Sequence, residues 1–295
     1  MVVVCGEALV DLTPARCGHD DGFVPHPGGS PYNVAVGLAR LGVDTAFFGR
    51  LSHDPFGELL RGHLEANGVD ATLVRRGPQP TALAFVHLSD GEPRYAFHFE
   101  GTADRSLRPE DLPSLDPSVR AVHFGSLSLA LEPGASTLEA MMRRQAGAAR
   151  LVSVDPNVRP ALVGDRDDYL RRLDGWLGLA DVVKVSVEDL AWLHPDEDPV
   201  DVGRQWRRHG PGLVVITRGV DGAVAWSERA RAEVAAPPVD VVDTVGAGDA
   251  FMSGLLCWLA ERGRVESEGP GGLDEAALGD ALAFAARVAG TTCAR

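Results

Sequence analysis

The chain has 295 residues, of which 45% are hydrophobic, and its formal net charge is −14 at pH 7. This length suits one large α/β domain or two small ones, and the hydrophobic content is that of a folded globular protein rather than a disordered one. The acidic balance argues against nucleic acid or an anionic membrane surface as a partner, although helix N-termini can still bind a phosphorylated ligand locally.

The first residues predict a buried strand and not a targeting segment. Residues 2–5 are apolar, and Gly6 and Glu7 follow at once without a basic stretch before them. No apolar run is long enough to predict a membrane span, and the scattered cysteines favour reduced thiols in a cytoplasmic protein. Apolar residues resume at 8–10 and end at Asp11. This aspartate either starts a turn or offers a carboxylate to a small polar ligand.

Two glycines precede the first predicted helix, in the segment GGSPYN at residues 28–33. Ser30 has the pattern of an N-cap and Pro31 that of a first helical residue, so we expect a helix that ends near residue 41. The flexible glycine backbone and the amide of Asn33 would then lie beside a helix N-terminus.

A β-rich stretch interrupts the chain after a strand and a helix. Residues 81–88 and 94–99 are rich in β-formers and flank a polar turn at 89–93, which predicts a hairpin. We expect this hairpin to form a small β-sheet lid from about 12–27 and 71–102. An ordinary edge hairpin is the alternative.

From residue 119 onward, strands and helices alternate as in a mostly parallel sheet flanked by helices. Strands are expected at 119–125, 151–155, 181–185, 212–217 and 223–226. Helices are expected at 137–149, from 186, and at 273–291. Polar residues stand at or near the strand ends, namely Asp11, Ser126, Asp155, Asn157, Arg159, Lys184 and Thr217. Because the carboxyl ends of parallel strands share one edge, we expect ligand contacts there.

The segment VDTVGAGDAF, at residues 242–251, leads into a helix expected at 250–263. A Gly-Ala-Gly turn before a helix leaves N–H groups unpaired at the positive end of the helix dipole, where they suit an anion. Asp249 follows this turn. It either caps the helix or takes a proton from a hydroxyl that attacks a bound phosphate, and the polar strand ends favour the second interpretation.

The two segments 28–42 and 243–251 resemble the two signatures of the pfkB, or ribokinase-like, sugar kinase family, and the resemblance covers essentially the whole chain. It implies a ribokinase-like three-layer sandwich, with a central mostly parallel sheet flanked by helices. The chain would be a single domain over residues 1–295 with the small lid inserted in it. The resemblance also implies ATP-dependent transfer of the γ-phosphoryl group to a hydroxymethyl of a small sugar.

The resemblance implies the catalytic roles as well. Asp249 would be the base, and the N–H groups of the turn formed by Gly246, Ala247 and Gly248 would stabilise the developing phosphate charge. Mg²⁺ would bridge the phosphates of ATP, with Glu188 acting through the water shell of the metal. A helix-capping role for Glu188 is the alternative.

The binding residues follow from the same resemblance. The expected sugar-binding residues are Asp11, Gly28, Gly29, Asn33 and Arg159. The expected nucleotide-binding residues are Lys184, Thr217, Gly219, Gly222 and Gly248. Asp243 and Thr244 lie where some members bind a monovalent cation, which makes potassium a further expected cofactor. Ala286 departs from the pattern, because many members carry an asparagine near this position to contact adenine.

The first signature looks most like the bacterial fructokinase branch, which implies conversion of D-fructose to fructose 6-phosphate. A 2-dehydro-3-deoxygluconate kinase is the alternative, and its acid substrate would need Arg159 or Arg105. A nucleoside substrate has less support, since the chain shows no evident aromatic base clamp beyond Tyr32, Tyr95 and Phe97.

Two alternative hypotheses assign the chain to other classes of protein. A catalytically silent sugar sensor would have no need of a base at Asp249. A dinucleotide-binding oxidoreductase would need Gly-x-Gly-x-x-Gly after the first strand, which residues 6–9 lack. The histidines have no ligand spacing, so we expect no structural metal. The exposed edges of the lid strands favour a homodimer formed through the lid.

Overall fold

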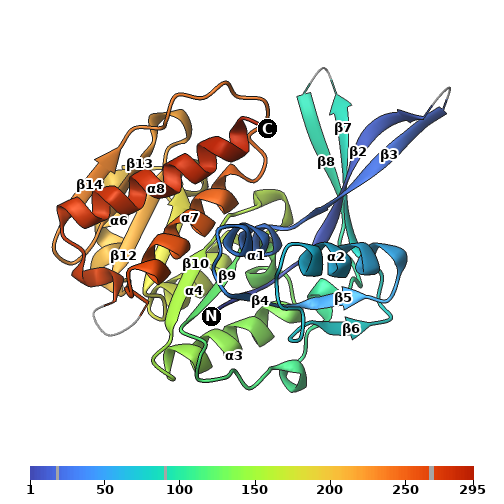
Figure 1. The fold of residues 1–295 in the computed structure, drawn as a ribbon, viewed down its shortest axis with the longest axis horizontal. Helices are drawn as coiled ribbons and strands as arrows, with labels where there is room; N and C mark the ends of the chain where they lie inside the picture. Colours follow the sequence, from blue (N-terminus) through green and yellow to red (C-terminus); the bar gives the residue numbers. More distant parts are fainter. Residues whose placement is uncertain (18–19, 90–91, 266–268) are drawn as a thin grey trace.

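The structure is a computed structural model that describes residues 1–17, 20–89, 92–265 and 269–295. Its centre is an eight-stranded sheet with the strand order β14-β13-β12-β11-β10-β9-β1-β4 (Figure 1). The strands are β1 (Val2–Cys5), β4 (Thr45–Phe48), β9 (Ala121–Gly125), β10 (Leu151–Asp155), β11 (Val182–Ser186), β12 (Leu213–Thr217), β13 (Ala223–Trp226) and β14 (Arg231–Val234). The strands from β4 to β12 in this order pair in parallel, and β13 and β14 are antiparallel.

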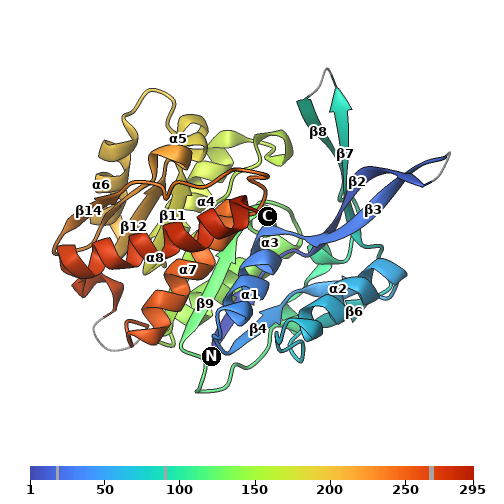
Figure 2. The same ribbon diagram turned by 45° about the horizontal axis from the view of Figure 1, so that its top comes forward.

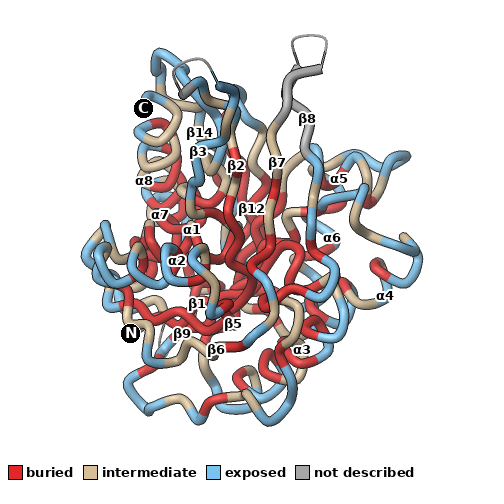
Figure 3. Tube along the Cα trace, turned by 90° about the vertical axis from the view of Figure 1, so that its right-hand side faces the viewer, coloured by how far each residue is buried: buried red, intermediate tan, exposed pale blue. Residues whose placement is uncertain are grey.

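Helices cover both faces of this sheet because its strands are apolar on both sides. In β1, Val2 and Val4 belong to one hydrophobic cluster, whereas Val3 and Cys5 belong to the other. The first cluster packs against α1 (Ser30–Arg40), α2 (Pro55–Ala66), α7 (Ala247–Glu261) and α8 (Glu275–Cys293). The second packs against α3 (Gly134–Ala146), α4 (Arg166–Leu177), α5 (Val187–Leu193) and α6 (Pro199–His209). The expected three-layer sandwich is confirmed, and the buried core runs along its sheet (Figure 3).

A second sheet projects from this body beside α1 and α2 (Figures 1 and 2). Its strand order is β3-β2-β7-β8, with β2 (Leu9–Cys17), β3 (Asp20–Gly28), β7 (Ala82–Ser89) and β8 (Glu92–His98). The expected hairpin therefore pairs with the segment around 12–27, through parallel β2 and β7. Residues 90–91 of its turn lie outside the described part of the chain. Within 71–81, Arg75–Gly77 (β6) pairs instead with β5 (Arg50–Ser52).

Three local expectations were wrong. The strand near Asp11 does not end there, because pairing with β3 continues it to Cys17. Ser30 is not an N-cap, since Gly29 holds that position and Ser30 is already helical. The helix α7 begins at Ala247 and not at residue 250, because the left-handed conformation of Gly246 lets the following glycine-rich residues enter the helix. None of the helices among the described residues is long and apolar enough to cross a bilayer.

Candidate active site

Asp249 lies in the first turn of α7, three residues into the helix. The turn before it depends on Gly246, whose φ of 75° is unfavourable for residues with a Cβ. The Ala247 N–H donates to the Thr244 carbonyl, whereas the next first-turn N–H groups, those of Gly248 and Asp249, have no intrahelical acceptor. The helix start therefore presents donors to an anion beside a carboxylate.

Two side chains of α1 hold the Asp249 carboxylate. The Ser30 hydroxyl donates to Oδ1 at 2.7 Å, and the Asn33 amide donates to Oδ2 at 2.9 Å. Burial raises the pKa of Asp249, while these two hydrogen bonds and the positive charges of Lys184 and Arg159 oppose the rise. The carboxylate is thus oriented, shielded from water and a stronger base than an ordinary aspartate.

Beneath the turn lies a buried ion pair between neighbouring strands. Lys184 of β11 is 3% exposed, and its Nζ donates to Oδ2 of the fully buried Asp155 of β10 at 2.9 Å. A Cβ built on Gly248 would come within 3.1 Å of Lys184 Nζ. The ammonium group therefore lies directly against the glycine turn.

Asp11 belongs to the second sheet, where it faces His26 of β3 and Ala84 of β7. A Cβ on Gly28 would come within 2.3 Å of Asp11 Oδ2, so glycine makes room for this carboxylate. Burial raises the pKa of Asp11 to about 6, against the charge of His26.

Gly29 connects this carboxylate to the start of α1. Its φ is 106°, and a Cβ there would meet the Glu7 carbonyl at 2.9 Å. Only glycine fits such a conformation easily. Of the predicted sugar residues, Asp11 thus lies against Gly28, Gly29 is the N-cap of α1, and Asn33 bonds the Asp249 carboxylate.

A cavity of ≈ 230 Å³ separates Arg159 from Glu188. Its lining residues are Asn157, Val158, Arg159, Pro160, Ser186, Glu188, Asp189 and Trp192. The Arg159 guanidinium donates to Asn157 Oδ1 at 2.7 Å, which folds it over the loop after β10. Glu188 is exposed at the start of α5.

Helix capping at α5 falls to Asp189 and not to Glu188. Ser186 and Asp189 form a reciprocal capping box, and Asp189 also accepts the Val158 N–H at 2.8 Å. The alternative role of Glu188 as a capping residue is thus wrong. Glu188 is exposed and lines the same cavity as Arg159.

The predicted nucleotide residues follow β12. Thr217 ends this strand, and the short 3₁₀ helix η5 (Gly219–Asp221) comes next. Gly222 has a φ of 87°, and a Cβ there would lie 2.0 Å from the Val234 carbonyl oxygen, so glycine is required for the reversal into β13.

The predicted cation-binding residues lie on an exposed segment before α7. Asp243 and Thr244 are both exposed, and the Asp243 N–H donates to the Cys293 carbonyl at the end of α8, at 3.3 Å. Asp243 Oδ1 accepts the Val245 N–H at 2.9 Å. Within the described part of the chain, the side-chain hydrogen bonds of the Asp249 carboxylate come from Ser30 and Asn33 and not from this segment.

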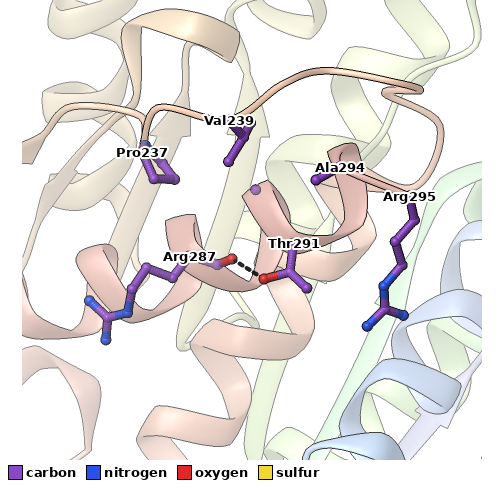
Figure 4. A pocket seen from close by; sticks show the side chains of 7 residues that line it. Pro237, Val239, Arg287, Thr291, Ala294 and Arg295 are labelled. Atoms are coloured by element: carbon purple, nitrogen blue, oxygen red, sulfur yellow. Dashed lines mark hydrogen bonds between the residues drawn. The ribbon is translucent and has the colours of Figure 1, made fainter.

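A larger cavity, of ≈ 470 Å³, lies between α8 and the segment that leads to Asp243 (Figure 4). It is lined by Pro237, Val239, Arg287, Gly290, Thr291, Ala294 and Arg295. None of these residues is a candidate general base, and none belongs to an anion-binding turn. We therefore place the candidate catalytic site at Asp249 and not in this larger cavity.

Sequence reasoning missed three residues of this site. Ser30 had the pattern of a cap, and no local signal reveals its contact with Asp249. Asp155 was expected at the ligand-binding edge of the sheet, but not as the buried ionic partner of Lys184. Asp189 could have been found from the spacing Ser-x-x-Asp, which is a capping-box pattern.

Comparison with known proteins gives consistent results. The model of the pfkB family carbohydrate kinases matches residues 1–295. A fructokinase of Rhizobium leguminosarum bv. trifolii is 40% identical over 279 residues, which cover 94% of this chain and 85% of that protein. The crystal structure of a Xylella fastidiosa fructokinase with bound ATP has a TM-score of 0.89 at 32% identity, covering 100% of this chain and 92% of that one. A Vibrio cholerae O395 fructokinase with bound fructose, ADP and calcium ion has a TM-score of 0.87 at 32% identity, with the same coverage.

Proposed function

Because the chain belongs to the pfkB family of carbohydrate kinases, we propose that it phosphorylates D-fructose to fructose 6-phosphate at the expense of ATP. The chain is a phosphotransferase with an alcohol group as acceptor, like the fructokinases to which it is similar. The observation that carries the proposal is the buried carboxylate of Asp249, held by Ser30 and Asn33 beside the glycine turn.

The reaction follows from this arrangement. The sugar hydroxyl gives its proton to Asp249 as its oxygen attacks the γ-phosphorus, and the bond between that phosphorus and the bridging oxygen of ADP breaks. Donors at the start of α7 stabilise the negative charge that gathers on the transferred group. The N–H groups proposed for this task are those of Gly248 and Asp249, because the Ala247 N–H already donates to the Thr244 carbonyl. The expected donor role of Ala247 is therefore dropped, and Gly246 contributes the left-handed turn.

Sugar recognition is assigned to Asp11, Asn33 and Arg159, together with Gly28 and Gly29. Gly28 leaves room for the Asp11 carboxylate, and Gly29 lets the chain pass close to the Glu7 carbonyl. The second sheet would act as a lid that excludes water from the transfer. Thr217, Gly219 and Gly222 are assigned to the nucleotide side, together with Gly248. Substrate, lid and nucleotide would then meet over the carboxyl ends of the parallel strands.

We assign Mg²⁺ to ATP rather than to a protein cage. Among the described residues, no three of His, Cys, Asp and Glu gather as a metal site. Mg²⁺ commonly binds through phosphate oxygens and waters with few carboxylates, and the exposed Glu188 fits such a role. The bound ion would neutralise phosphate charge. Potassium near Asp243 and Thr244 is a further proposal, and equal turnover in sodium and potassium chloride would contradict it.

An acid sugar such as 2-dehydro-3-deoxygluconate has less support. Of the two arginines considered for its carboxylate, Arg105 donates to the carbonyls of Glu132 and Phe99. Arg159 also donates within the chain, to Asn157 and to the Val158 carbonyl, so each of the two arginines already has internal partners. A cytoplasmic location, where ATP is abundant, stays a prediction.

The test of the function is ADP release from Mg-ATP with fructose, 2-dehydro-3-deoxygluconate, ribose, adenosine, fructose 6-phosphate and a blank without sugar. We expect turnover on fructose well above the others. Turnover only on the acid sugar would assign Arg159 to its carboxylate and contradict the fructose proposal. Sugar binding without turnover on any compound would instead support a sensor.

We predict a homodimer formed through the second sheet. Its outer strand β3 exposes Phe23 (50%) and Val24 (42%), and Phe23 packs edge-on against Phe85. Exposed apolar residues on a strand edge favour association with a second chain. Light scattering at micromolar concentration is expected to give twice the chain mass, and Phe23→Asp is expected to shift it toward the monomer. A monomeric wild type would contradict the prediction.

A further inference from the structure

The buried pair of Lys184 and Asp155 lies beside the turn before Asp249, and the proposed function gives it no task. Family resemblance assigned Lys184 to the nucleotide. The structure instead ties its Nζ to Asp155 at 2.9 Å, with the two side chains 4% and 0% exposed. A Cβ built on Gly248 would lie 3.1 Å from the same Nζ. Lys184 is therefore buried beneath the site and does not face solvent.

Several charged groups face Asp249 from the elements packed around it. Lys184 comes from β11, and Arg159 comes from the loop after β10. Asp155 of β10 and Asp189 of α5 contribute negative charge to the same region. From α1 only the uncharged Ser30 and Asn33 reach the carboxylate.

The charge state of the pair follows from its surroundings. Burial lowers the pKa of Lys184, but the attraction of Asp155, Asp189 and Asp249 outweighs burial and raises it. Burial raises the pKa of Asp155 to about 6, so this carboxyl remains ionised at neutral pH. Lys184 is therefore a fixed cation.

A neutral histidine, His123, adds a further polar side chain near the Lys184–Asp155 pair within the sheet. His123 of β9 is fully buried, and its Nδ1 lies 2.9 Å from the Ser153 hydroxyl. Burial, followed by the charge of Lys184, lowers the pKa of His123 to about 3, so the ring stays neutral at physiological pH. The net cationic influence on Asp249 from below thus comes from Lys184.

We propose that Lys184 is a positioning residue for the phosphoryl transfer, which supports the Gly248 turn from below and keeps the carboxylate of Asp249 ionised without touching the nucleotide. Asp155 anchors the lysine in this place. The inference rests on the proposed kinase function, because it assigns Lys184 a task in the same site. The two roles predict different effects of replacing Lys184. A nucleotide-binding role changes the KM for ATP, whereas the positioning role changes the pH dependence of kcat/KM.

The test compares the pH dependence of kcat/KM for fructose, at saturating Mg-ATP, in wild type and Lys184→Met. Removing a nearby cation disfavours the ionised form of Asp249. The acid limb is therefore expected to move up by about 1 pH unit, which lowers activity about 10-fold on that limb and leaves the alkaline plateau closer to wild type. The KM for ATP is expected to change less than about 3-fold. An unmoved limb with a raised KM for ATP would overturn the proposal.

Two further variants keep the test decisive. Asp155→Asn removes an anion while Asp189 and Asp249 still keep Lys184 charged, so its acid limb is expected to move down. Lys184→Met alone leaves Asp155 buried and unpaired, which can prevent folding. The double variant Lys184→Met/Asp155→Asn removes both charges, and its limb is expected to move up by less than in the single variant. A limb at or below the wild-type position in the double variant would contradict the proposal.

A measurement without turnover separates this inference from the proposed function. The carboxyl ¹³C signal of Asp249, assigned by its loss in Asp249→Asn, is titrated in wild type and in the Lys184 variants. If the wild type phosphorylates no sugar, the proposed function fails, but a titration midpoint that rises in Lys184→Met still supports the electrostatic role. An unchanged midpoint would overturn the inference alone.

Discussion

Replacement of Asp249 by asparagine is expected to lower kcat for fructose by about 10²–10⁴-fold, the range that a general base contributes. Asparagine is nearly isosteric and can still accept the hydrogen bond from Ser30, but it cannot take the proton of the sugar hydroxyl. Fructose binding is expected to remain within a few-fold of wild type. Steady-state ADP release measures the loss of turnover, and calorimetric titration with fructose measures binding.

A matched control comes from the other end of the same helix. Glu261 is exposed at the last turn of α7, so Glu261→Gln also removes one negative charge from this helix without touching the site. Its kcat is expected to equal that of wild type. If Asp249→Asn were as active as this control, Asp249 would not be the base.

The second large effect is expected on sugar binding, from Asp11→Ala. The carboxylate lies against Gly28, two residues before the start of α1, and a hydrogen bond to a charged group contributes about 1.5–3 kcal/mol. Losing it is expected to raise the KM for fructose by about 10–10²-fold, with a smaller change in kcat. Initial rates over a range of fructose concentrations separate the two constants.

A matched control variant tests whether this effect is specific to Asp11. Asp21→Ala removes an exposed acid from the neighbouring strand β3, and its KM is expected to match wild type. An equal rise in both variants would point to general damage to the second sheet. An unchanged KM in Asp11→Ala would remove Asp11 from sugar binding.

The affinity for fructose is expected to depend on pH through the same carboxylate. Burial raises the pKa of Asp11 to about 6, so the group becomes protonated and neutral as the pH falls through that value. A neutral carboxyl accepts weaker hydrogen bonds, and the dissociation constant for fructose is therefore expected to rise below about pH 6. Binding titrations at several pH values measure it, and Asp11→Asn is expected to lose this dependence. A wild type with flat affinity from pH 5 to pH 8 would contradict the assignment.

The local sequence determined the elements that build the site. Alternating apolar runs and polar stops predicted the strands β10 and β13 at their observed bounds, because buried parallel and hairpin strands leave a short-range hydrophobic signal. The glycine pattern before Asp249 is also a local signal, and it predicted an anion-binding helix start. Only backbone without a Cβ takes up the left-handed turn at Gly246.

Tertiary structure decided which side chains work together. Ser30 and Asp249 are 219 residues apart, and no local pattern indicates that a residue with the sequence of a cap would bond a carboxylate on another helix. Lys184 was expected near a strand end as a nucleotide-binding residue, but the packing of β10 against β11 buries it beside Asp155. Local propensity follows from backbone conformation over a few residues, whereas burial and charge pairing depend on which elements meet in space. The sequence thus determined the fold class and indicated Asp249 as the proposed base, and the packing decided the partners and the electrostatic surroundings of that carboxylate.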